Sequence, residues 1–115
     1  MKREEWEKKY KGQLRKITVT VKDIRGICGA GLKPGDKFVI EGSNLILKES
    51  DKVCPTALVS IYPMIFAMKF GVDPKFLGGE YAQCLDPGPP YTCGGTVIFE
   101  IKAEKKGSSN SVWQR

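Results

Sequence analysis

Apolar and polar side chains alternate strictly between Leu14 and Asp23, and this alternation is the strongest constraint on the fold. Ile17, Val19 and Val21 occupy one side of an extended chain, and lysines and threonines occupy the other. Successive side chains of a strand point to opposite faces of a sheet, so the pattern predicts a strand with one buried face. That face must pack against another layer of the fold.

Further strands are predicted downstream. The turn sequence 33–36 has Pro and then Gly at its centre, which favours a type II turn leading into a strand over 37–41. Residues 42–44 are typical of a hairpin connection to a second strand over 45–48. Alternation resumes at 96–102, which predicts the last strand.

The stretch Val53-Cys54-Pro55-Thr56 predicts a helix start. Proline is well tolerated at the first helical position, so Cys54 is the predicted N-cap. The partial positive charge of that helix end stabilises a thiolate, the form of cysteine that binds metals and attacks electrophiles.

A broad apolar face follows at helical spacing and predicts a helix laid on the sheet. Pro63 interrupts it and predicts a kink, or two short helices meeting at Tyr62, and Gly71 is the predicted end. Three aromatic residues of this region are expected in the core: Tyr62, Phe66 and Phe70.

The length of 115 residues fits one domain. We predict a small α+β domain over 14–103, an antiparallel or mixed sheet of about four strands with one kinked helix packed on it. Residues 1–13 form a charged N-terminal arm in this interpretation, with Trp6 and Tyr10 on one face of a short helix, and 104–115 form a flexible tail.

The net charge of +6 belongs to the ends of the chain. Residues 17–102 carry nine basic and nine acidic groups, so specific nucleic-acid binding is not expected. No apolar run is long enough to span a membrane, and the N-terminus lacks the features of a secretory signal. We therefore predict a cytoplasmic protein, with homo-oligomer formation left open.

Four cysteines and no histidine define the candidate chemistry. Each cysteine lies beside Gly or Pro or at the end of an element, where its side chain can reach a shared site. Thiolates without imidazole suit zinc or an iron–sulfur cluster, so we predict a metal site at one end of the domain. Its candidate ligands are Cys28, Cys54, Cys84 and Cys93.

The long gaps between the cysteines leave other interpretations open. The thiols can be unligated, as packed or redox-reactive groups, or can form disulfides. In a thiol enzyme Cys54 is the candidate nucleophile, and Asp86 or Tyr62 would have to transfer protons. A third alternative is a non-catalytic interaction module that uses the basic arm. The sequence does not decide whether the protein is an enzyme.

Several short motifs together resemble a family of short bacterial and archaeal proteins. In chain order they are Cys28 in a glycine-rich turn, Gly35-Asp36-Lys37-Phe38-Val39-Ile40, Cys54-Pro55-Thr56-Ala57, Tyr62-Pro63, Cys84-Leu85-Asp86-Pro87 and Phe99-Glu100. The resemblance covers residues 17–102 and implies a common fold and a shared set of three cysteines, with no established activity. Cys93 falls outside the pattern. Three thiolates would leave one coordination position open.

Overall fold

The computed structural model describes residues 1–104, so the predicted tail, apart from Glu104, lies outside the described residues. The fold is α+β, as predicted. Its helices are α1 (Arg3–Lys9) and α2 (Pro55–Lys69), and its strands are β1 (Lys16–Gly26), β2 (Lys37–Glu41), β3 (Asn44–Leu45), β4 (Tyr81–Gln83) and β5 (Gly95–Glu104). Residues 1–104 also contain three short 3-10 helices: η1 (Lys11–Gln13), η2 (Leu47–Glu49) and η3 (Pro74–Leu77).

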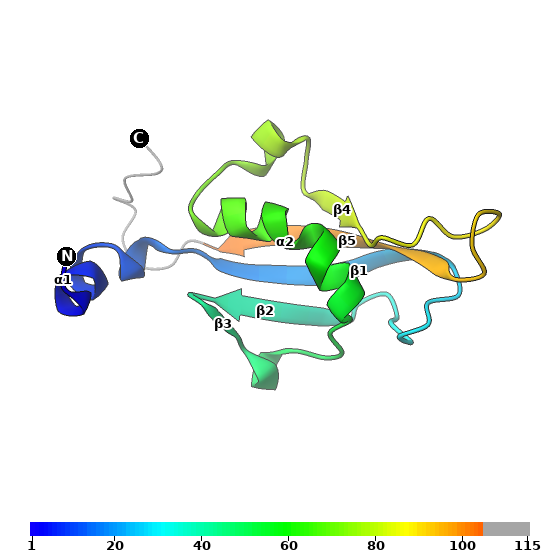
Figure 1. The fold of residues 1–115 in the computed structure, drawn as a ribbon, viewed down its shortest axis with the longest axis horizontal. Helices are drawn as coiled ribbons and strands as arrows, with labels where there is room; N and C mark the ends of the chain where they lie inside the picture. Colours follow the sequence, from blue (N-terminus) through cyan, green and yellow to red (C-terminus); the bar gives the residue numbers. More distant parts are fainter. Residues whose placement is uncertain (105–115) are drawn as a thin grey trace.

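The strands form one antiparallel sheet in the order β3-β2-β1-β5-β4 (Figure 1). β1 and β5 are the central pair, and their register runs from Lys16 opposite Glu104 to Gly26 opposite Gly95. The expectation of about four strands was one too few, because β4 forms inside a Gly/Pro-rich stretch that carries no alternation of its own. Pairing with β5 holds those three residues extended.

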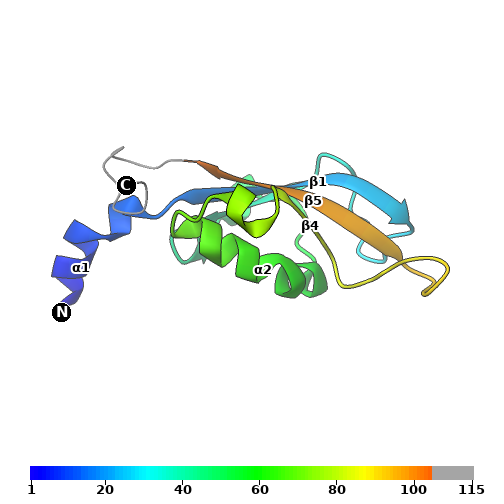
Figure 2. The same cartoon turned by 90° about the horizontal axis from the view of Figure 1, so that it is seen from above.

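α2 covers one face of the sheet (Figure 2). The alternation predicted the inward residues of the central strands correctly, since Ile17, Val19 and Val21 are buried. On β5 the inward residues are Val97, Phe99 and Ile101, which join the same core. The Phe38 and Phe99 rings meet edge to face, with centroids 6.5 Å apart.

α2 begins where the sequence predicted, with Cys54 as N-cap and Pro55 in the first turn. It is one helix rather than two, although it contains Pro63. Its axis changes direction partway along (Figure 1), as expected where a proline removes a backbone hydrogen bond. Gly71, just after the helix, has a φ of 99°, the left-handed conformation that favours glycine.

The prediction that the aromatic residues of α2 lie in the core was wrong for two of them. Tyr62 and Phe66 are 36% and 49% exposed, whereas Phe70 is half-buried. The residues that α2 buries are Ala57, Ile61, Ile65, Met68 and Lys69. Apolar side chains surround this helix, so the sequence pattern did not show which side faces the sheet.

The predicted strand over 45–48 is much shorter than expected. β3 ends at Leu45, and Leu47–Glu49 form η2 instead. The next residues bond to the edge of β2: the Ser50 hydroxyl accepts from the Val39 N–H at 3.0 Å, and the Asp51 carboxylate accepts from the Lys37 N–H at 3.0 Å. These bonds anchor the segment that leads to Cys54.

α1 was predicted as a short helix in the N-terminal arm, and it buries none of its residues. Figure 2 shows it projecting from the end of the sheet opposite to the 84–95 loop. Among residues 1–104, no helix has the length and apolar character needed to cross a membrane.

Candidate functional site

Cys84 follows the edge strand β4 and is buried. Its backbone N–H donates to the Val97 carbonyl at 3.1 Å, and the Val97 N–H donates back to the Cys84 sulfur at 3.3 Å. The carbonyl oxygens of Gly95 and Asp86 lie 3.7 and 3.8 Å from the same sulfur and can accept its proton. The start of β5 therefore fixes this thiol, and one N–H is available to stabilise it as a thiolate.

Cys54 is half-exposed at the first turn of α2. Its backbone adopts the extended conformation of an N-cap, and its side chain makes no capping hydrogen bond. The unpaired N–H groups of the first turn give this end of the helix a partial positive charge. The Cys54 sulfur is thus free to face a ligand beside that charge.

Cys28 lies in the loop that follows β1 and is half-exposed. The Gly31 N–H donates to the Cys28 carbonyl at 3.0 Å and closes a turn, in which Gly31 has a φ of 74°. Leu32, the next residue, is buried and anchors the turn to the core.

These three cysteines line a single pocket of about 260 Å³. It is bounded by the loop after β1, the first turn of α2 and the start of β5. The other lining residues are Gly29, Ala30, Leu32, Thr56, Ala57, Asp86, Gly95 and Val97. The fold therefore brings together Cys28, Cys54 and Cys84, the three residues of the resemblance pattern.

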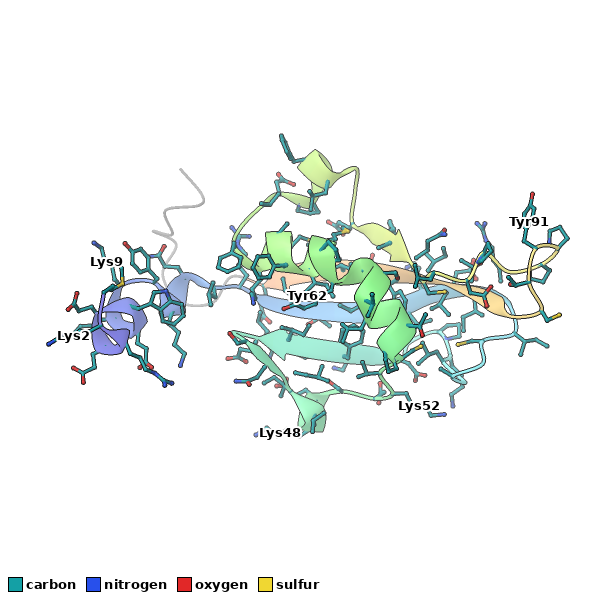
Figure 3. All side chains as sticks on the ribbon, in the orientation of Figure 1. Lys2, Lys9, Lys48, Lys52, Tyr62 and Tyr91 are labelled. Carbon is teal, nitrogen blue, oxygen red and sulfur yellow. The ribbon has the colours of Figure 1, made fainter. Side chains whose placement is uncertain are left out.

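Cys93 does not line this pocket and is exposed. It lies in the loop between β4 and β5, whose far end carries Tyr91 (Figure 3). All four cysteines, each within the described range, are free thiols.

Asp86 organises the loop that carries Cys93. Its carboxylate accepts from the Gly88 N–H at 2.9 Å and from the Thr92 hydroxyl. Its backbone carbonyl accepts from the Thr96 hydroxyl at 2.8 Å. The Thr92 hydroxyl, followed by the Gly88 N–H, lowers the pKa of Asp86, so the group is a weak proton acceptor. An Asp-Pro-Gly sequence is the signal from which this turn could have been predicted.

Two neighbouring glycines, one of which lines the pocket, allow close packing at the start of β5. A Cβ at Gly95 would lie 2.7 Å from the Ile27 nitrogen and 2.8 Å from the Arg25 carbonyl oxygen. A Cβ at Gly94 would overlap the Asp86 carboxylate. Since real Cβ contacts are longer than this, only glycine fits these two positions without displacement of the backbone or of Asp86.

A positively charged side chain, that of Lys52, lies near the loop that contains Cys28. The Lys52 ammonium lies 3.3 Å from the position that a Cβ on Gly31 would occupy. Figure 3 shows Lys52 near the beginning of α2. The surroundings of the thiol pocket therefore carry charges of both signs, since Lys52 and the helix end are positive and the Asp86 carboxylate, which lines the pocket, is negative.

The cysteine sulfurs are not gathered as they would be around a bound single ion. Within residues 1–104, no group of three or more Cys, Asp or Glu side chains is arranged to hold a metal ion. The three sulfurs border a common space instead of meeting at one point.

The proton-transfer roles considered for a thiol enzyme find little support. Tyr62 does not line the thiol pocket, and its ring packs against Phe66 at a centroid distance of 6.2 Å. Asp86 does line the pocket, but its carboxylate is held by Thr92 and Gly88.

Comparison with protein-family models, with curated proteins and with solved structures found no match to this chain. The family resemblance of the motifs therefore stays a prediction.

Proposed function

We propose that the protein binds an iron–sulfur cluster through Cys28, Cys54 and Cys84. The observation that carries the proposal is that these three thiols, separated by long stretches of sequence, line one pocket beside the N-terminus of α2. Thiolates are the usual protein ligands of such clusters, and the chain contains no histidine to compete for that role.

We favour a cluster over zinc because no group of ligands is gathered closely enough to hold a single ion in residues 1–104. Zinc–sulfur bonds of about 2.3 Å in a tetrahedral site require sulfurs about 4 Å apart. A four-iron cluster separates its cysteine sulfurs by roughly 6 Å, because each binds a different iron atom. Three thiols around a space of about 260 Å³, with no group gathered for a single ion in the described part of the chain, match the wider arrangement.

Several groups around the pocket would offset the charge of a bound anionic cluster, whereas the Asp86 carboxylate, which also lines it, would not. The Val97 N–H points at the Cys84 sulfur, and hydrogen bonds of this kind tune cluster potential. The first turn of α2 and the nearby Lys52 offset thiolate charge. Gly29 and Gly95, which also line the pocket, leave room for the cluster beside the backbone.

The lining includes no fourth cysteine, so one iron of a four-iron cluster would lack a thiolate from this pocket. Such a cluster supplies electron transfer, or a Lewis-acidic iron with an open position. The chain itself contributes the three thiolates and the surrounding N–H groups. A reducing compartment such as the cytoplasm is consistent with four free thiols.

Anaerobic purification with iron, sulfide and zinc analysis tests the proposal. We expect brown protein with several irons per chain, and loss of most of that iron in Cys28→Ser, Cys54→Ser or Cys84→Ser. Cys93→Ser is the matched control and should keep its iron, because Cys93 does not line the pocket. Colourless protein with less than about 0.2 metal per chain would refute metal binding, and one zinc per chain without iron would refute the cluster.

A second candidate function is a thiol or redox protein. Cys54 favours it, since a half-exposed thiol at a helix N-terminus is a suitable nucleophile. Alkylation of the metal-free protein, mapped by mass spectrometry, tests it. Cys54 should react faster than the more exposed Cys93; equal or slower reaction would contradict this role.

A further inference from the structure

We propose that the Asp86 carboxylate is the fourth protein ligand of the cluster, and that its Oδ2 atom binds the iron that the three cysteines leave without a thiolate. This inference rests on the proposed function and deepens it. Of the described residues that line the thiol pocket, only Asp86 and the three cysteines carry side chains that bind iron as anions. The pocket therefore offers one ligand group for each iron of a four-iron cluster.

The two oxygens of the Asp86 carboxylate have different surroundings. Oδ1 accepts both hydrogen bonds of this side chain, from the Gly88 N–H at 2.9 Å and from the Thr92 hydroxyl. Among residues 1–104, no group donates to Oδ2, which lies against Gly94, and no side-chain oxygen is buried without a partner. Oδ2 is therefore accessible to a ligand. Carboxylates that bind metals are themselves oriented by hydrogen bonds, and Asp86 already has this arrangement.

The backbone of Asp86 is fixed beside a cysteine ligand. Its carbonyl oxygen lies 3.8 Å from the Cys84 sulfur and accepts a hydrogen bond from the Thr96 hydroxyl at 2.8 Å. Cys84 is held in turn by its two hydrogen bonds with Val97 on β5. The fold thus places both ligand groups at the pocket before any cluster binds, which lowers the entropic cost of binding.

Cys93 is the other candidate for the fourth position, and its location is less suitable. It is exposed and does not line the pocket. Figure 3 shows Tyr91, two residues before Cys93, at the outer tip of the loop. The hydroxyl of Thr92, the residue between them, donates to Asp86. In this conformation the loop orients the Asp86 carboxylate and leaves the Cys93 thiol outside the pocket.

Charge also favours a bond between Asp86 and iron. An ionised carboxylate that lined the pocket without binding would repel the anionic cluster. As a ligand it replaces a fourth thiolate, which carries the same single negative charge, so the total equals that of a cluster held by four cysteines. With every iron bound by the protein, the cluster suits electron transfer better than the binding of a substrate at an open iron.

Electron–nuclear double resonance of the reduced cluster tests this role, in the anaerobically purified full chain labelled with ¹³C-aspartate. The wild type should show coupling to the ¹³C of the bound carboxylate, and Asp86→Asn should abolish it. This variant keeps an oxygen that can accept from Thr92 and Gly88 but loses the charge that binds iron. After brief exposure to air it should also lose about one iron per chain more than the wild type, because one iron lacks a protein ligand.

Asp36→Asn is the matched control, because the Asp36 carboxylate also accepts a backbone N–H, that of Lys33 at 2.9 Å, and does not line the pocket. It should keep the coupling. Thr92→Val should keep it too, since this change removes a hydrogen bond to Oδ1 and leaves the ligand oxygen. Iron-loaded wild type without ¹³C coupling, or coupling that Asp86→Asn retains, overturns the role of Asp86 alone. Wild type that binds no iron overturns both proposals.

Discussion

Gly95→Ala is the substitution that most directly tests how the thiol pocket is built. The added methyl group would lie 2.7 Å from the Ile27 nitrogen, and 2.8 Å from both the Arg25 oxygen and the Ile27 carbonyl carbon. All three are backbone atoms, so no flexible side chain can move aside. Carbon contacts are optimal at about 3.5–4.0 Å, so the start of β5 and the end of β1 must separate by a good part of 1 Å.

Overpacking of this kind costs about 1–3 kcal/mol. For a domain of this size, 1 kcal/mol corresponds to about 4–8 °C in melting temperature, so we expect a decrease of roughly 5–20 °C. The displaced backbone includes the Gly95 carbonyl beside the Cys84 sulfur and the residue before Cys28. If the protein binds the proposed cluster, Gly95→Ala should therefore also reduce the iron content of anaerobically purified protein.

Urea unfolding followed by circular dichroism measures the loss, with Gly12→Ala as the control. A methyl group added at Gly12 would have no other atom within 4 Å, and Gly12 has no positive φ, so its replacement should be neutral or slightly stabilising. Free energies of unfolding that agree within about 0.5 kcal/mol for the two variants would refute the argument that the pocket wall requires glycine.

Two further predictions concern the residues around the pocket. Cys84→Ala should lower the free energy of unfolding of the metal-free protein by about 1–3 kcal/mol, because the buried Val97 N–H loses its acceptor. Cys84→Ser should lose less, because its oxygen can accept that hydrogen bond, and equal urea midpoints for the two variants would contradict this reasoning. Asp86→Asn should be less stable than the wild type at neutral pH, because hydrogen bonds from Thr92 and Gly88 favour the charged carboxylate and lower its pKa. That advantage is present above the ordinary Asp pKa of about 3.9 and is lost as pH falls through the lower folded-state pKa, so the two unfolding free energies should converge in acid; a difference independent of pH would count against it.

Two kinds of sequence pattern predicted elements correctly: the alternation of apolar and polar side chains, and a proline at the start of a helix. Alternation predicted β1 and β5, and the Cys54-Pro55 pair predicted the start of α2. β4 could not be found this way, because three residues in a Gly/Pro-rich stretch become a strand only through pairing with β5. The prediction of which α2 residues are buried was wrong for a related reason. The helix has apolar residues on both sides, and only packing against the sheet decides which side is buried.

The members of the candidate site were predictable only in part, and its geometry was not. Residue types and loop positions indicated that all four cysteines would converge, but only Cys28, Cys54 and Cys84 line the pocket, and Cys93 does not. Their mutual spacing depends on the close backbone contacts at Gly95, and no pattern in the sequence encodes those distances. The role of Asp86 in its loop depends on Thr92, whose side chain comes near only after the loop has closed.

The pairing of β1 with β5, from Lys16 opposite Glu104 to Gly26 opposite Gly95, has a kinetic consequence. Contacts between residues so distant in sequence form slowly, because a long loop must close before they are gained. The position of Cys84 depends on β5, and that of Cys28 on the end of β1. The three thiols therefore stay apart and open to oxidation until the central strands have met, and insertion of the proposed cluster should follow folding instead of guiding it.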